Sequence, residues 1–270
     1  MSYAFPMGGL PAQDVNPEGT AVFKTAYAFI PAITMRDIVT SNLPHWTGTR
    51  AWILARPLSG FAETFAQYAV EVTKGGGSDR PEPDKGAEGV VFVASGEMQL
   101  IIDGDAHVLG PGGYAYLPAG CGWRVKNTGD APLQFHWIRK RYEPVPGIDR
   151  PTAFVTHERD VAFNTMPNTD KWATQRFVDP SDMRHDMHVN IVTFQPGGVI
   201  PFAETHVMEH GLYVLQGTAR YLLNDDWVDV GPGDFMWLRA FCPQACIATG
   251  NTPFRYLLYK DVNRHVGLTL

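Results

Sequence analysis

Apolar and polar residues along this chain form short runs that glycine, asparagine and aspartate interrupt. The stretches "GVVFVASGEMQLIIDG" and "GLYVLQGTARYLLNDD" are dominated by β-branched, aromatic and other apolar residues, which is typical of strands separated by tight turns. Turn residues recur roughly every ten positions, and this spacing favours a sandwich or barrel of short antiparallel strands. Helix signals are weak throughout, so the pattern predicts an all-β protein.

The second half of the chain repeats the first half at a fixed offset. A segment that begins at Gly96 aligns without gaps with one that begins at Gly217, so the offset is 217 − 96 = 121 residues. The Gly-Pro-Gly run at 110–112, for example, meets a second Gly-Pro-Gly run at 231–233. Self-similarity of this kind indicates a duplicated domain.

A proline-rich, charged stretch lies between the two copies and predicts a linker. We therefore place the domain boundary near residue 150. Residues 1–150 then form an N-terminal domain with an N-terminal extension, and residues 151–270 form a C-terminal domain. The apolar stretches 27–35 and 50–58 can add edge strands.

Composition narrows the possible partners and the compartment. The net charge of −6 argues against nucleic acid and against an anionic membrane surface, because neither finds a basic footprint. The three cysteines provide no disulfide framework, which fits a reduced compartment. The start of the chain shows no secretion signal, and no apolar stretch approaches the ~18 residues that span a bilayer. We expect a cytoplasmic protein that binds a small molecule, and a homo-oligomer, because exposed strands pair between subunits.

Two short motifs at matching positions of the repeat resemble those of the cupin family. Residues 198–217 keep the spacing of the first cupin motif, and its polar positions are filled by Glu204, His206 and His210. The second motif is matched in the first repeat by residues 112–127 and places Gln244 at its ligand position in the second repeat. The resemblance implies a bicupin, that is, two jelly-roll β-barrels in tandem.

Only the second repeat keeps metal-ligand side chains at the motif positions. Glu204, His206, His210 and Gln244 offer one carboxylate, two imidazoles and one amide, a set that favours Mn²⁺ or Fe²⁺ over structural zinc. Glu204 and His206 are two residues apart on a predicted strand, so they point to one face. Subtracting 121 gives four positions that cannot hold a metal ion, namely Pro83, Lys85, Gly89 and Trp123. The metal site of the first barrel is therefore expected to be degenerate.

The ligand order Glu, His, His with a distant Gln is similar to that of the (S)-ureidoglycine aminohydrolases. That family carries E-x-H-x-x-x-H-G, a later Gln and a C-terminal Y-K-D-x-N-R motif, which are matched here by "ETHVMEHG", Gln244 and "YKDVNR". The resemblance implies Mn²⁺ as the cofactor and a hydrolase that acts on a C–N bond. It would release ammonia from the ureido substrate (S)-ureidoglycine and give (S)-ureidoglycolate, a step of allantoin degradation in purine catabolism.

Chemistry at the aminal carbon of such a substrate needs a proton carrier and groups that bind the substrate. Lys260 in the C-terminal motif is the candidate proton carrier, because a partly desolvated lysine beside a metal titrates lower than usual. Glu204 is a second catalytic candidate. The related enzymes carry D-x-N-x-H where this chain has "DMHVN", so histidine and asparagine are exchanged here. Candidate substrate-binding residues are Tyr221, His188, Asn190 and Arg239, with Asp186 on the same face as the second and third, and Arg184 as another carboxylate clamp.

Two other functions fit parts of the pattern. A cupin dioxygenase or isomerase would use Fe²⁺ on another small carboxylic acid, but such enzymes usually rely on histidine-rich ligand sets. A non-catalytic binding bicupin would need neither the ligand set nor Lys260. The Glu/Gln pair together with Lys260 favours the aminohydrolase.

Overall fold

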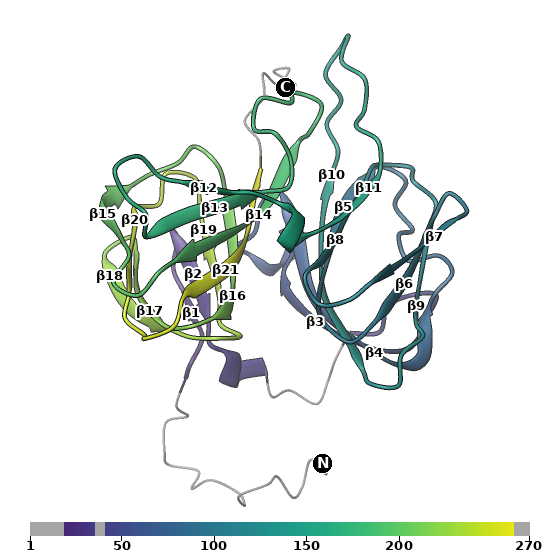
Figure 1. The fold of residues 1–270 in the computed structure, drawn as a ribbon, viewed down its shortest axis with the longest axis horizontal. Helices are drawn as coiled ribbons and strands as arrows, with labels where there is room; N and C mark the ends of the chain where they lie inside the picture. Colours follow the sequence, from purple (N-terminus) through teal and green to yellow (C-terminus); the bar gives the residue numbers. More distant parts are fainter. Residues whose placement is uncertain (1–18, 36–40, 262–270) are drawn as a thin grey trace, which may run out of the picture.

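The computed structural model describes residues 19–35 and 41–261, and these residues form an all-β protein. Two barrels of antiparallel strands lie side by side (Figure 1). The predicted architecture of two jelly-roll barrels in tandem is therefore confirmed. Among the described residues, no helix is long and apolar enough to cross a membrane. The helices of this part of the chain are short 3₁₀ turns: η1 (Ala32–Met35), η2 (Pro57–Ser59) and η3 (Glu158–Asp160).

The first barrel is one sheet that curves around its own core. The strands follow the order β11-β8-β5-β10-β4-β9-β6-β7, and β3 pairs with β4. Their bounds are β3 (Trp46–Ala55), β4 (Phe65–Ser78), β5 (Ala87–Ser95), β6 (Met98–Ile102), β7 (Asp105–Leu109), β8 (Gly113–Leu117), β9 (Trp123–Asn127), β10 (Leu133–Arg141) and β11 (Phe154–His157).

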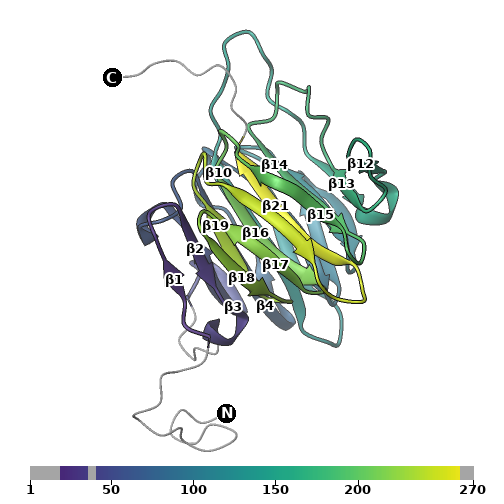
Figure 2. The same cartoon turned by 90° about the vertical axis from the view of Figure 1, so that its left-hand side faces the viewer.

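The second barrel consists of an eight-stranded sheet, ordered β1-β2-β19-β16-β21-β14-β13-β12, and a four-stranded sheet, ordered β15-β20-β17-β18. Figure 2 shows this barrel from its outer side. The strands are β1 (Val22–Phe23), β2 (Tyr27–Ile30), β12 (Phe163–Thr165), β13 (Trp172–Arg176), β14 (Met187–Phe194), β15 (Val199–Glu204), β16 (His210–Gln216), β17 (Ala219–Leu223), β18 (Asp226–Val230), β19 (Phe235–Leu238), β20 (Gln244–Ala248) and β21 (Phe254–Asp261).

Each barrel takes an edge strand from the other half of the sequence. Strand β2, which precedes the first barrel, pairs with β19 of the second barrel. Strand β11, which lies beyond residue 150, pairs with β8 of the first barrel. We had assigned the N-terminal extension to the first domain, whereas its strand β2 pairs with the second barrel. The boundary near residue 150 itself stays a prediction.

Three apolar clusters follow from strand alternation. One fills the second barrel, one fills the first barrel, and the third lies between the barrels. Strand β14 serves two of them, because Val192 and Phe194 point into the second barrel whereas Val189 and Ile191 point to the first. All eight residues of β14 are buried for this reason, and strands covered on both faces lose the polar alternation of a solvent-exposed sheet.

The repeat is also visible in the backbone. Gly96 and Gly217, which are 121 residues apart, have φ angles of 80° and 72°. A Cβ atom would lie 2.6 Å from the carbonyl oxygen of Pro132 at the first position and 2.4 Å from that of Pro253 at the second. Only glycine avoids both the left-handed strain and the clash. The two turns therefore have the same left-handed backbone conformation in both barrels.

A buried ion pair joins the barrels. Lys140 Nζ of β10 lies 2.6 Å from Asp186 Oδ2, and both side chains are almost fully buried. Asp186 also accepts a hydrogen bond from the backbone N–H of Glu143. We expected Asp186 to line the site on the same face as His188 and Asn190. This expectation is wrong, because the Asp186 carboxylate binds Lys140 of the other barrel.

Asp186→Ala should destabilise the protein by about 3–5 kcal/mol, because it leaves the Lys140 ammonium buried without its counter-ion. Thermal unfolding measured for Asp186→Ala and for Asp130→Ala tests this. Asp130 forms an equally short but exposed pair with Lys74, so its loss should cost less than about 1 kcal/mol. Equal shifts in the two variants would contradict the assigned role of the buried pair.

Candidate functional site

Three predicted site residues lie abreast on neighbouring strands of the second barrel. Lys260 of β21 pairs in register with His188 of β14 on one side and with His210 of β16 on the other. The same row continues to Leu238 and Tyr27, which belong to the core of this barrel. Residues paired in register point to the same face of a sheet. The three polar side chains therefore point into the barrel.

The four-stranded sheet supplies the opposite side of the site. Glu204 of β15 pairs in register with Gln244 of β20, and the amide nitrogen of Gln244 lies 3.4 Å from Glu204 Oε1. His206 Nε2 lies 3.2 Å from the same oxygen. The rings of His206 and His210 have centroids 5.1 Å apart. The four predicted metal ligands, which come from both sheets, therefore meet in one place.

The donor types of the four predicted ligands fit a divalent ion, but their donor atoms do not surround one common point. Among residues 19–35 and 41–261, no group of three or more His, Cys, Asp or Glu side chains is arranged so that it could hold a metal ion. The amide oxygen of Gln244 accepts a hydrogen bond from Tyr221 (2.7 Å), so the amide nitrogen faces Glu204. A half-turn of the amide would present oxygen instead, as a hard cation requires. The four side chains therefore lie together without forming a closed ligand set.

Tyr221 lies behind Gln244 and is fully buried. Its hydroxyl donates to Gln244 Oε1, and burial raises the pKa of Tyr221 well above its ordinary value, so the phenol remains a neutral donor. This placement makes Tyr221 a residue that orients a predicted ligand. The substrate-binding role that we predicted for Tyr221 stays a prediction.

Burial sets the protonation of the row. It lowers the pKa of His210 to about 3 with help from His206 and Lys260, and it lowers that of His188 to about 4 with help from Lys260. Burial and the positive charge of Arg176 also lower the pKa of Lys260. Both imidazoles are thus neutral at physiological pH. His188 Nε2 is buried and has no hydrogen-bond partner among the described residues, so it is available to a ligand.

His136, which lies between the barrels against Tyr213, provides a test of this burial outside the site. Burial lowers its pKa from 6.5 to about 4. Between these values the unfolded chain binds the proton more readily, so stability is lost as pH falls below 6.5. His136→Phe should remove about 2 kcal/mol of that loss by pH 5. Thermal unfolding of both proteins from pH 7.5 to 5 checks this, and parallel curves would contradict it.

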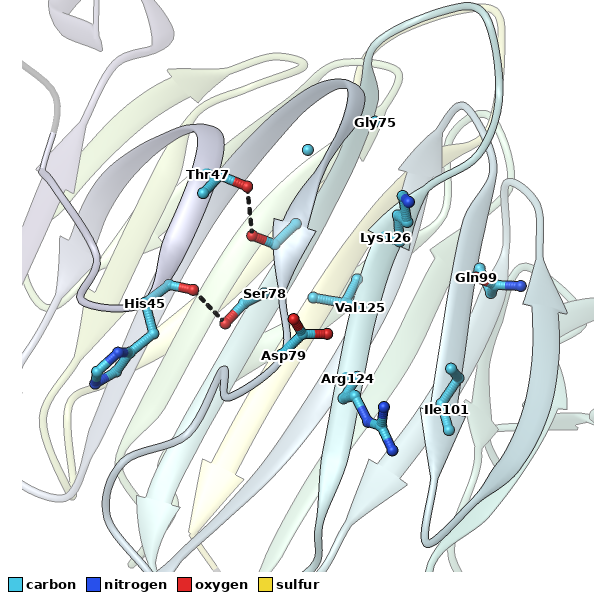
Figure 3. A pocket seen from close by; sticks show the side chains of 12 residues that line it. His45, Thr47, Gly75, Ser78, Asp79, Gln99, Ile101, Arg124, Val125 and Lys126 are labelled. Atoms are coloured by element: carbon cyan, nitrogen blue, oxygen red, sulfur yellow. Dashed lines mark hydrogen bonds between the residues drawn. The ribbon is translucent and has the colours of Figure 1, made fainter.

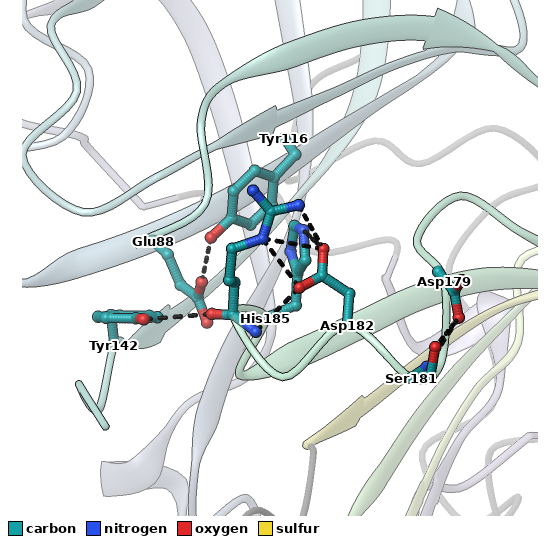
Figure 4. Close-up of polar contacts among 8 residues, drawn as sticks. Glu88, Tyr116, Tyr142, Asp179, Ser181, Asp182 and His185 are labelled. Atoms are coloured by element: carbon teal, nitrogen blue, oxygen red, sulfur yellow. Dashed lines mark hydrogen bonds and ion pairs between the residues drawn. The ribbon is translucent and has the colours of Figure 1, made fainter. Parts of the chain in front are cut away.

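The two arginines predicted as carboxylate clamps are already paired. Arg239 Nη2 lies 2.8 Å from Glu63 Oε1, and about half of the Arg239 side chain is exposed. Arg184 bonds Asp182 at 2.7 Å, within a cluster that also contains His185 and Tyr142 (Figure 4). The structure therefore does not bring either guanidinium to the row of His188 and Lys260.

Sequence reasoning missed two residues that belong to the site or support it. Glu209 is buried, and its carboxylate accepts hydrogen bonds from the backbone N–H groups of Glu63 (2.6 Å) and Thr64 (2.8 Å), which fixes the start of β16 just before His210. Arg176 ends β13 and pairs in register with Asn190. Glu209 stands at a variable position of the "ETHVMEHG" motif, and Arg176 stands outside every motif. Only a correct register of β13 against β14 could have found Arg176.

The first barrel contains different groups at the equivalent positions. Arg139, which stands 121 residues before Lys260, is ion-paired with Glu82. A cavity of about 190 Å³ at this mouth is lined by Glu82, Lys85, Gly89 and Trp123, among others. A second hollow of about 230 Å³ lies beside β9 and is lined by residues that include His45, Ser78 and Arg124 (Figure 3). Neither hollow contains a predicted site residue of the second barrel.

A known family and several known proteins are similar to this chain. The cupin-domain family model matches residues 68–139 and 190–259. The (S)-ureidoglycine aminohydrolase of Escherichia coli K12 is 30% identical over 87% of this chain and 88% of its own length. That of Arabidopsis thaliana is 30% identical over 94% of this chain and 81% of its own. A Pseudomonas aeruginosa crystal structure with the working name glyoxylate-induced protein is 62% identical, with a TM-score of 0.88 over 95% of this chain and 96% of that one.

Proposed function

The chain belongs to the (S)-ureidoglycine aminohydrolase family of cupins, and we propose that its second barrel hydrolyses (S)-ureidoglycine to (S)-ureidoglycolate and ammonia. One observation carries the proposal. Lys260, whose pKa is lowered, stands between His188 and His210 and across the barrel from Glu204 and Gln244. This is the arrangement that a metal-assisted proton transfer at a C–N bond requires.

A divalent ion, Mn²⁺ in this proposal, would be held by Glu204, His206, His210 and Gln244. When bound, it supplies Lewis-acid polarisation of the aminal centre and a template for the substrate. The neutral imidazole of His210 suits this role, because a metal ligand must offer its lone pair. Tyr221 supports the set by orienting the Gln244 amide.

The proton movements fall to Lys260 and Glu204. Because its pKa is lowered, Lys260 can take a proton at Nζ from the attacking water and return it to the departing amine. The C–O bond then forms as the C–N bond breaks, and ammonia leaves neutral. Glu204 is the alternative acceptor for this same proton of the water, and the other proton stays on the product hydroxyl. The assignment of Lys260 follows from the direction of its pKa shift, because a proton carrier works best when its pKa is moved towards the working pH.

His188 and Asn190 are the residues proposed to bind the ureido group. Both are buried and point into the barrel, and His188 Nε2 has no partner among the described residues. The exchange of histidine and asparagine relative to the family pattern preserves donors and acceptors on both side chains. Arg239 remains a predicted substrate-binding residue that would have to leave Glu63 first.

We also propose that the protein forms a homo-oligomer, that it works in the cytoplasm and that its substrate is a small ureido acid. The exposed edges of the sheets support self-association. The acidic net charge of −6 supports a small-molecule partner rather than nucleic acid.

Ammonia release tests the proposed function directly. Ureidoglycine is unstable, so it should be generated in the cuvette from allantoate by allantoate amidohydrolase. We expect a second equivalent of ammonia to appear faster with this protein and Mn²⁺ than with the generating enzyme alone. A chelator added beforehand should remove the acceleration. Equal rates with and without the metal-loaded protein would contradict the proposal.

A further inference from the structure

We propose that Arg176, at the end of β13, binds the carboxylate of the substrate and so selects α-ureido acids over neutral analogues. The inference rests on the proposed function for the identity of the acid, but it depends on the structure for the anion site. No motif includes this residue, and its position follows only from the pairing of β13 with β14.

The register places Arg176 inside the mouth of the second barrel. It pairs with Asn190, and this row continues through Leu258 and Leu212 to Met236. Leu212 and Met236 belong to the core of the barrel, so the row points inward. It lies two residues from the row of His188, Lys260 and His210 along β14. Arg176 is exposed whereas Asn190 is buried, which places the guanidinium at the entrance.

The positive charge of Arg176 affects two residues of the neighbouring row, Lys260 and His188. Its positive charge contributes to the lowered pKa of Lys260 and to that of His188. Electrostatic effects of this kind fall off with distance and with solvent screening. The register agrees with this, because Arg176 lies opposite Asn190 on the inward face of β14, two residues from His188.

Arg176 is also a cation without a counter-ion. In the described ranges, no carboxylate lies within ion-pair distance of its guanidinium, whereas Arg184 is paired with Asp182 and Arg239 with Glu63. A guanidinium with free N–H groups at the mouth of a polar site suits a carboxylate, which it can bind through two parallel hydrogen bonds.

The experiment uses two stable probes that differ in one charge, ureidoacetate and its neutral amide, ureidoacetamide. Each is titrated calorimetrically into the Mn²⁺-loaded protein. Arg176→Gln should weaken ureidoacetate binding by about 10- to 100-fold, the usual range for a lost charged hydrogen bond. The same variant should leave ureidoacetamide binding unchanged. Arg176→Lys should show an intermediate affinity for ureidoacetate. Lysine keeps the positive charge but cannot form the two parallel hydrogen bonds of a guanidinium.

Arg220→Gln is the matched control. Arg220 lies on the outer face of the same barrel over the ring of Trp227, and its removal changes the net charge equally, so both probes should bind as they do to the wild type. Unchanged ureidoacetate affinity in Arg176→Gln would overturn the proposal, and so would an equal loss for both probes. Binding is read without turnover. A protein that failed to release ammonia from ureidoglycine but still required Arg176 for the anion would contradict the proposed function and leave the anion site intact.

Discussion

Lys260→Met is expected to lower the turnover of ureidoglycine by about 10²- to 10⁴-fold, the usual contribution of a positioned proton carrier. Methionine keeps most of the length of lysine and its apolar character, but it cannot move a proton. The side chain lies between His188 and His210 in one row, so the packing of the row should be kept. We therefore expect bound metal and the unfolding temperature to stay close to those of the wild type.

The measurement is kcat together with metal content by mass spectrometry. Lys260→Arg provides a sharper comparison, because an arginine holds its proton at every physiological pH and should not restore activity. The first barrel has arginine at the equivalent position, where Arg139 is ion-paired with Glu82. Lys85→Met, at the mouth of that barrel, is the control and should leave turnover unchanged. Wild-type turnover in Lys260→Met would remove the lysine from the mechanism.

Part of the candidate site could be predicted from sequence, because motif spacing and an internal repeat can be read in one chain. The 121-residue repeat separates the barrel that carries the predicted ligands from the one that does not. Our expectation that Glu204 and His206 share one strand is wrong, because β15 ends at Glu204 and His206 lies in the segment that follows it. The fold class followed from the same repeat. A motif spacing is local, and an internal repeat compares the chain with itself, so a single sequence is enough to detect both. The last residues of the "YKDVNR" motif lie outside the described residues, so that part of the motif stays a prediction.

The features that sequence missed depend on which strands pair. Nothing in "YAFI" says that β2 joins β19 some 200 residues later, and nothing in "WATQR" gives its register against β14. Side-chain partners are equally hidden. Asp186 was expected to face the site, yet Lys140 of the other barrel binds it, and Arg239 is occupied by Glu63. Long-range pairings of this kind arise only when the barrels are assembled.

Metal content provides the second decisive test. Glu204→Ala and His206→Ala should each weaken Mn²⁺ binding by at least about 100-fold, because loss of a ligand should cost no less than loss of a supporting contact, which already costs 10- to 100-fold. Each substitution removes one donor from a set of four, and Glu204 supplies its only anionic oxygen. Both side chains are partly exposed, so stability of the metal-free protein should change little. Equilibrium dialysis against Mn²⁺ measures the effect.

Trp123→Ala separates ligand loss from general damage. Trp123 occupies in the first barrel the position that Gln244 occupies in the second, and it packs edge-on against Trp46 and Trp137. Its removal should destabilise the protein by about 3–5 kcal/mol and leave Mn²⁺ affinity unchanged. Glu204→Ala should show the opposite pattern. If the two variants behaved alike, metal affinity would reflect the stability of the fold rather than Glu204 itself. If Glu204→Ala and His206→Ala bound Mn²⁺ like the wild type, the ligands would lie elsewhere.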